Sequence, residues 1–288
     1  MEVAIVKSFS YEGGGGNGAG VVILEKQVAD EKKQEIACRI GLSETAFVLK
    51  RDDNNYDVSF FTPVSEVDLC GHATIAAFYY LAEKGFIKGN NETKVIYQNT
   101  KAGRLKINLT FKDGVYVLMQ QTSPRIYNDL RDKIKQIAKS LNLDERQMGL
   151  EGCQLYPTIV STGLKDIMIP VKSRDILNSI NANFKAISKI SKENNVIGYH
   201  VFTIDEGTIY ARNFAPLVGI DEECATGTSN GALASLLYSR ALANSSVEII
   251  QGEAMNEKSM VFVKINEVDN ILDVYVGGKA FIENYLEI

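Results

Sequence analysis

The stretch LCGHATIAA at residues 69–77 is matched later in the chain by ECATGTSNGA at residues 223–232. In each, a cysteine, Cys70 or Cys224, precedes small and hydroxyl-bearing residues and then a run typical of a helix. A helix start presents unpaired backbone N–H groups and the positive end of the helix dipole. An anion can bind there, and a thiol there is expected to lose its proton more easily. The pattern predicts two helix starts that face each other across one active site.

The spacing between matching positions indicates an internal duplication. Cys70 and Cys224, like Gln98 and Gln251, are separated by about 153 residues, roughly half of the 288-residue chain. A repeat of this length indicates two similar domains rather than a solenoid. We predict an α+β fold of two pseudo-symmetric half-barrels, each wrapped round a central helix. The halves are expected at residues 1–124 and 125–288, with the last strand a candidate to pack on the first half.

Periodicity and turn residues predict the other elements. We expect a strand, a glycine loop and a second strand over the first 24 residues. A helix is expected from Val28 to Ile40, ended by Gly41, and another over residues 174–192. The charged stretch around residues 127–142 predicts a surface helix that joins the halves.

The composition argues against several classes of protein. The net charge is −5 and Lys and Arg form no run, so binding to nucleic acid or an anionic membrane is not expected. No apolar run reaches the ~18 residues of a membrane span, and Met1 to Val6 predicts a strand rather than a signal peptide. We therefore expect a cytoplasmic protein, and exposed strand edges would permit a homodimer.

Neither a disulfide framework nor a metal site is expected. The four cysteines are far apart with no C-x-x-C pair, and the chain has only two histidines, His72 and His200. Zinc sites in proteins are typically built from close ligand pairs, which this sequence lacks. We expect a small carboxylate-bearing substrate, held by the helix starts without any cofactor.

Four residues are candidates for chemistry. Cys70 and Cys224 could serve as base and acid on opposite faces of a substrate carbon, although free cysteine is also a common core residue. Glu44 lies between a helix end and an apolar strand. If it faces a pocket, burial should raise its pKa and suit it to acid/base work; otherwise it is a solvated turn carboxylate. His72 could move a proton or bind the substrate, or only order its own loop.

Further residues are candidates for binding the substrate. Glu223 is a carboxylate just before the second helix start, with a solvated charge as the alternative. Backbone N–H and side-chain donors at the two helix starts and the glycine loop complete the set: Asn17, Gly71, Ala73, Gly227, Thr228 and Ser229.

Several of these stretches together resemble a known family. GNGAGVV at residues 16–22, SETAFV at 43–48, LCGHAT at 69–74 and ATGTS at 225–229 resemble, in order along the whole chain, the PhzF-like family of phenazine biosynthesis. The resemblance implies a fold similar to diaminopimelate epimerase and proline racemase, with two pseudo-symmetric halves. It also implies a cofactor-independent isomerase in which Glu44 takes the acid/base position and His72 contacts the substrate.

The chain departs from the family pattern before the second helix. Glu223 stands where many members carry aspartate, and Cys224 resembles the second thiol of the racemases. Three functions therefore stay open. The first is a PhzF-type isomerase that uses Glu44. The second is a racemase or epimerase of amino or hydroxy acids that uses both thiols. The third is a non-catalytic protein that binds a small molecule.

Overall fold

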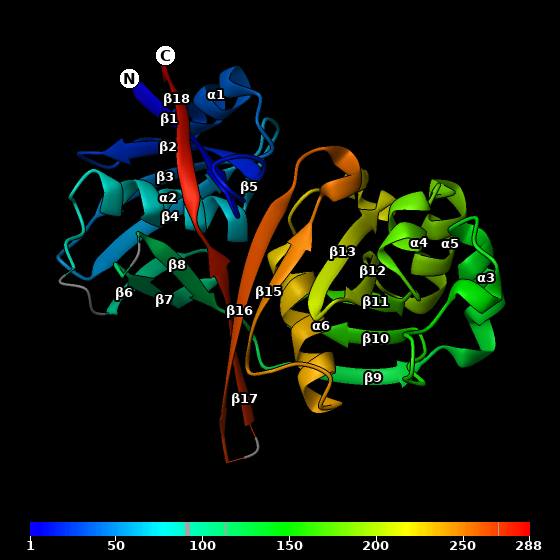
Figure 1. Ribbon diagram of the computed structural model, residues 1–288. Helices are drawn as coiled ribbons and strands as arrows, with labels where there is room; N and C mark the ends of the chain where they lie inside the picture. Colours follow the sequence, from blue (N-terminus) through cyan, green and yellow to red (C-terminus); the bar gives the residue numbers. More distant parts are fainter. Residues whose placement is uncertain (90–92, 113, 270) are drawn as a thin grey trace. The chain divides into compact units, whose positions relative to one another are not determined.

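The computed structural model describes residues 1–89, 93–112, 114–269 and 271–288. The chain forms two compact units of mixed helix and sheet (Figure 1). Unit 1 comprises Met1–Gln120 together with Gly277–Ile288, and unit 2 comprises Gln121–Val276.

Unit 1 is a curved sheet around one helix. Its pairing order is β18–β1–β2–β3–β4–β6–β7–β8, with β2/β3 and β4/β6 parallel and a short β5 beside β4. Helix α1 (Asp30–Ile40) connects β2 to β3, and α2 (Gly71–Glu83) lies between β4 and β6. The strands are β1 (Glu2–Ser8), β2 (Asn17–Leu24), β3 (Thr45–Lys50), β4 (Asn55–Phe61), β5 (Glu66–Val67), β6 (Lys94–Thr100), β7 (Gly103–Thr110), β8 (Tyr116–Gln120) and β18 (Ala280–Glu287).

Unit 2 repeats this succession. Its pairing order is β9–β10–β11–β12–β13–β15–β16, with β11/β12 and β13/β15 parallel and β14 beside β13. Helices α4 (Arg174–Ser179) and α5 (Phe184–Asn194) lie between β11 and β12, and α6 (Gly227–Ser239) lies between β13 and β15. The strands are β9 (Arg125–Asp129), β10 (Thr158–Ser161), β11 (Lys165–Pro170), β12 (Gly198–Asp205), β13 (Thr208–Ala215), β14 (Ile220–Glu223), β15 (Ser246–Gln251), β16 (Ser259–Val268) and β17 (Ile271–Gly278).

When the two repeats are aligned as β1–β9 and β10–β18, the terminal strand of each belongs to the sheet of the other. β9 follows β8 along the chain, yet it pairs with β10 in unit 2. β18 follows β17 and pairs with β1 in unit 1, which places the two chain ends together. The Met1 ammonium donates to the Ile288 carbonyl at 2.5 Å. Each unit therefore needs a strand from the other repeat to complete its sheet.

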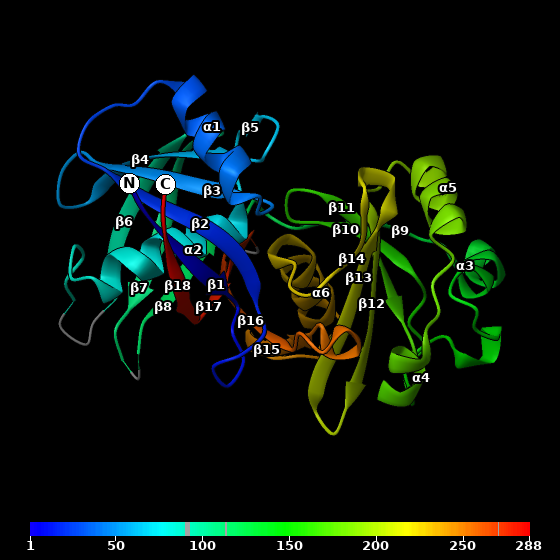
Figure 2. The same ribbon diagram turned by 90° about the horizontal axis from the view of Figure 1, so that it is seen from above.

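The two central helices are buried because their packing faces are made of small residues. Ala73, Ala76 and Ala77 of α2 are fully buried, and this helix contacts β1, β2, β3, β8 and β18. In α6, a Cβ atom on Gly231 would lie 2.8 Å from the Val276 side chain, so only glycine permits this close packing. Figures 1 and 2 both show α6 on one face of strands β10–β13 and α3 (Ile134–Ser140), α4 and α5 on the other.

Two of the predicted helices differ from the structure. The helix expected over residues 174–192 is two helices, because Asn183 ends the intervening turn and accepts a hydrogen bond from the Ala186 N–H as the N-cap of α5. The surface helix expected over residues 127–142 is wrong over its first part, which is strand β9. Its second part, α3, buries Ile137 against the core of unit 2. Gly41 ends α1 with φ +72°, as predicted.

Within the described ranges, no helix combines the length and the apolar character needed to cross a bilayer.

We expect Leu236→Ala in α6 to lower the free energy of unfolding by about 2–5 kcal/mol, because Leu236 is fully buried and its loss leaves a cavity. Leu164→Ala is the matched control, since Leu164 is half exposed and its replacement should cost less than about 0.5 kcal/mol. Urea unfolding followed by circular dichroism measures both. Equal losses in the two variants would contradict the placement of α6 at the core.

Candidate active site

Three of the predicted residues meet in unit 1. The Glu44 Oε2 atom lies 3.2 Å from His72 Nε2, and the Cys70 Sγ atom lies 3.5 Å from His72 Nδ1 and 3.9 Å from Nε2. The side chains of His72 and Glu44 are 11% and 21% exposed, so the cluster is largely shielded but can be reached from solvent. We refer to Glu44, Cys70 and His72 as the acid/base cluster.

The fold fixes this cluster from three elements. Glu44 lies immediately before β3, Cys70 is the N-cap of α2, and His72 is in the first turn of that helix. The Ser8 hydroxyl at the end of β1 donates to the His72 carbonyl at 2.6 Å. Ser43 Oγ lies 3.4 Å from His72 Nε2, so a hydroxyl also borders the imidazole. The adjacent first turn of α2 receives no side-chain cap from the described residues, which leaves its N–H groups to a ligand.

The electrostatics of the cluster separate an acid from a base. Burial acts to raise the pKa of Glu44, but the contacts with His72, Ser43 and Cys70 outweigh it and lower that pKa below its usual value. The Glu44 pKa is therefore lowered overall, whereas a raised pKa was expected from burial. Burial acts to lower the pKa of His72, but Cys70 and Glu44 outweigh it and raise that pKa well above 6.5. The pair thus favours a carboxylate beside an imidazolium.

The two helix starts show that Cys70 and Cys224 are not structurally equivalent. The N-cap of α6 is Thr226, and Cys224 lies two residues before it. In α2, Thr74 donates to the Cys70 carbonyl and contacts Gln98; in α6, Asn230 donates to the Thr226 carbonyl and contacts Gln251. The counterpart of Cys70 is therefore Thr226. The spacing in sequence misplaced this match by two residues.

Cys224 is also in an environment that opposes a thiolate. Burial and the neighbouring Glu223 carboxylate raise the pKa of the Cys224 thiol above its usual value. The expectation of an easily ionised thiol at this position is wrong, because the helix start lies farther along the chain and a like charge lies nearer.

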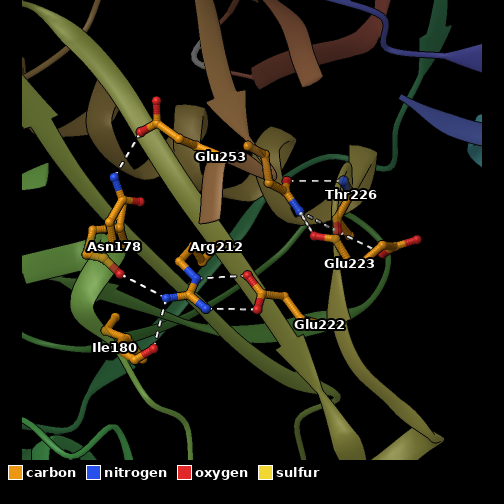
Figure 3. A network of polar contacts seen from close by, with 9 residues as sticks. Asn178, Ile180, Arg212, Glu222, Glu223, Thr226 and Glu253 are labelled. Carbon is orange, nitrogen blue, oxygen red and sulfur yellow. Dashed lines mark hydrogen bonds and ion pairs between the residues drawn. The ribbon is translucent and has the colours of Figure 1, made fainter. Parts of the chain in front are cut away.

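Glu223 ends β14 and is held by the start of α6. The Thr226 hydroxyl donates to Glu223 Oε2 at 2.8 Å, and the Gln251 side-chain amide donates to the Glu223 carbonyl at 2.7 Å (Figure 3). The Gln251 oxygen accepts from the Thr226 N–H and from Asn230. Gln251 is fully buried, so this network fixes the loop before α6. In the sequence, the only indication of this hydrogen-bond network was the recurrence of a glutamine at matching positions, Gln98 and Gln251.

The neighbouring carboxylate Glu222 has a structural role. Its two oxygens accept from Arg212 Nε and Nη2 at 2.8 Å each, and Arg212 Nη1 donates to the carbonyls of Leu177 and Ile180 (Figure 3). This buried pair ties β13 and β14 to the end of α4 and uses every functional atom of Glu222.

A polar hollow of about 350 Å³ lies in unit 2 beside α4 and is lined by Ser173, Arg174, Asp175, Asn178, Asp205 and Glu253. Arg174 binds both oxygens of Glu253, and Asn178 donates to one of them. These contacts outweigh the effect of burial and lower the pKa of Glu253 to about 2. The Arg174 and Glu253 charges of the hollow are paired with each other, so neither is a free reactive group.

The remaining predicted residues lie at the helix starts or near the glycine loop. Asn17 begins β2 and pairs with Ser8, and Gly71 and Gly227 begin α2 and α6. Ala73 is fully buried, so only its backbone could serve a ligand. Thr228 follows Gly227 in the first turn of α6.

Ser229 is engaged inside unit 2. Its hydroxyl donates to Asp166 at 2.5 Å and accepts from Asn213 at 3.2 Å. Burial raises the pKa of Asp166 despite the hydrogen bonds from Ser229 and the Gly198 backbone. Sequence reasoning missed Asp166, because a single carboxylate in an apolar strand carries no spacing signal.

The fold belongs to the class of two-repeat epimerase-like proteins, as predicted. A PhzF family phenazine biosynthesis protein of Bacillus anthracis superposes with a TM-score of 0.87 at 25% identity, over 100% of this chain and 98% of its own. A probable proline racemase of Agrobacterium radiobacter superposes with a TM-score of 0.65 at 14% identity, over 100% and 92% of the two chains, and shares the fold.

The sequence comparisons assign the family. The model of phenazine biosynthesis-like proteins, PhzC-PhzF, matches residues 6–284, and the chain belongs to this family. An uncharacterized isomerase of Clostridium acetobutylicum is 34% identical over 96% of this chain and 94% of its own. The resemblance noted in the sequence is thus confirmed, and the relatives' names agree with the expectation of an isomerase.

We expect the two histidines to titrate far apart in proton NMR spectra. His72 should titrate well above pH 6.5, whereas burial should hold the pKa of His200 at about 4. Glu44→Gln should lower the His72 pKa, since it removes the facing charge. The raised His72 pKa stabilises the fold below about pH 6.5, and this stabilisation is lost as pH rises through the folded pKa. A wild-type His72 that titrates below 6.5 would contradict the arrangement.

We expect Glu222→Gln to lower the free energy of unfolding by about 1–3 kcal/mol, because it weakens a charge-assisted pair and leaves the buried Arg212 poorly compensated. Glu223→Gln, one residue along, should cost less than about 1 kcal/mol, because glutamine still accepts from Thr226. Thermal unfolding of the two variants measures the difference, and a reversed order would show that the roles of the two carboxylates are misassigned.

Proposed function

We propose that the protein is a cofactor-independent isomerase that moves a proton on a small carboxylate-bearing substrate, with Glu44 as the acid/base residue. The observation that carries the proposal is the 3.2 Å contact between Glu44 and His72, whose pKa values are displaced in opposite directions. Two neighbouring groups with separated pKa values indicate which one is base and which one is acid. Membership of a family whose relatives are named isomerases supports the same reaction class.

The proposed reaction begins with proton removal. Glu44, ionised at neutral pH, takes a proton from a carbon that is conjugated with the substrate carboxylate. The electron pair left by the C–H bond delocalises toward that carboxylate. The His72 imidazolium stabilises the developing negative charge at short range. Glu44 then returns the proton to a different carbon of the substrate, which gives the isomer. This step also restores the ionised Glu44 side chain, so no external oxidant or acid is consumed.

The start of α2 is the proposed anchor for the substrate. Its first-turn N–H groups have no side-chain cap among the described residues, and the positive end of the helix dipole favours an anion. Gly71 at the first helical position leaves room for the ligand to approach the backbone. A bound carboxylate there would lie beside the acid/base cluster, which brings the reacting carbon toward Glu44.

The two-thiol alternative has less support. It needs a thiolate on each repeat, whereas the Cys224 pKa is raised and its position does not match that of Cys70. The non-catalytic alternative predicts binding without any hydrogen exchange, so one experiment separates all three functions.

We expect the wild-type enzyme to incorporate deuterium from D₂O into one member of a panel of small carboxylates, made of amino acids, hydroxy acids and unsaturated cyclic acids. Glu44→Gln should slow this exchange about 10²–10⁴-fold, because the base is lost. Proton NMR and mass spectrometry follow the exchange.

Glu66→Gln is the matched carboxylate control, because Glu66 is shielded in the same unit and paired with Lys101. It should exchange at the wild-type rate. An active Glu44→Gln variant would refute the mechanism, and exchange that survives Glu44→Gln but vanishes in both Cys70→Ala and Cys224→Ala would favour the racemase. The prediction that both helix starts serve one reaction is tested by Glu223→Gln in the same assay.

A further inference from the structure

The acid/base cluster has a second chemical property that the isomerase reaction does not use. Its three side chains offer a thiol sulfur, an imidazole nitrogen and a carboxylate oxygen, and these atoms all lie within 4.8 Å of one another. Cys70 and His72 lie two residues apart in the sequence, but Glu44 comes from the loop before β3 and joins them only in the fold.

The separations approach those of ligands around one zinc ion. With bonds of about 2.0 Å to nitrogen and oxygen and 2.3 Å to sulfur, tetrahedral geometry sets pairs of ligand atoms about 3.3–3.7 Å apart. His72 Nε2 lies 3.2 Å from Glu44 Oε2 and 3.9 Å from Cys70 Sγ. Because Cys70 Sγ also lies 3.5 Å from Nδ1, the imidazole must turn to point Nε2 at a shared ion before three bonds can form. A water molecule or the nearby Ser43 hydroxyl would supply the fourth ligand.

The donor set also suits the ion. Thiolate and imidazole ligands select zinc over magnesium or calcium, which prefer oxygen. One thiolate and one carboxylate neutralise the two positive charges of the ion, so its transfer into this shielded site leaves no net charge uncompensated. The Cys70 residue is 8% exposed and the Glu44 side chain 21% exposed, while Glu44 Oε2 itself is buried, so an ion would enter through a local side-chain movement.

We propose that Glu44, Cys70 and His72 form a zinc-binding site, and that zinc switches the isomerase off. The bond to sulfur forms as the Cys70 thiol proton leaves to solvent, and the bond to nitrogen forms as the imidazolium proton leaves. The Glu44 lone pair that takes the substrate proton is then bound to the metal. Metal binding stands on the geometry alone, whereas its inhibitory effect rests on the proposed function.

The test uses the full-length protein, first freed of metal with a chelator. Titration with Co²⁺ should give one ion per chain and a sulfur-to-cobalt charge-transfer band, which one equivalent of Zn²⁺ abolishes. Competition against a chromogenic zinc indicator should show at least tenfold weaker zinc binding by Cys70→Ser, Glu44→Gln and His72→Gln. Cys38→Ser and Glu66→Gln are matched controls that should bind zinc as the wild type does, since Cys38 is an exposed cysteine on α1 and Glu66 is paired with Lys101.

Wild-type protein whose cobalt complex lacks the charge-transfer band would overturn the proposal, as would unchanged zinc affinity in a folded Cys70→Ser variant. Thermal unfolding establishes that each variant is folded. If a variant is not folded, the cobalt spectrum of the wild-type protein decides whether the metal site exists. The deuterium exchange assay is run on metal-free protein, with and without added Zn²⁺. Failure of the proposed isomerase thus shows as absent exchange in metal-free protein, while failure of the zinc site shows in the spectra.

Discussion

Both central helices begin at partly shielded positions, and neither N-cap side chain makes a capping hydrogen bond within the described part of the chain, so first-turn N–H groups stay open to a ligand or water. The sheets wrap closely around α2 and α6 because small residues line the packing faces, so the backbone is brought near to other elements. The chain places polar groups directly before each helix: Cys70 and Thr226 are N-caps, and Gln98 and Gln251 contact the polar residue one turn further on. The candidate site lies at the open start of α2.

The two repeats share a central helix with polar residues at its start, but the chemistry at the two helix starts differs. In unit 1 the first turn carries His72 beside Glu44, which gives a titratable pair that solvent can reach. In unit 2 the corresponding region is occupied by hydrogen bonds among Thr226, Asn230 and Gln251, His200 is fully buried, and the pKa of Cys224 is raised. Reactive groups therefore gather at one helix start, while the other is built mainly for rigidity.

Much of this arrangement could be read from the sequence. The α+β class, the duplication, the glycine C-cap at Gly41 and the resemblance to the PhzF-like family all followed from local patterns and spacing. The direction of the Glu44 pKa could not be read, because it depends on how closely His72 approaches, and that distance is set by the packing of α2 against β1 and β3. The mismatch of Cys70 and Cys224 had a similar origin, since only hydrogen bonds to Gln98 and Gln251 show which residues truly correspond.

The exchange of β9 and β18 between the repeats has a consequence for how the chain folds as it is synthesised. A first domain usually folds once it has left the ribosome. Here β1 lacks its outer neighbour until residues 280–287 emerge, after all of unit 2. The first sheet must wait with an open backbone edge through more than half of translation, which exposes the nascent chain to mispairing. A gene divided between the two repeats would encode two fragments. The first would lack β18, which pairs with β1, and the second would lack β9, which pairs with β10.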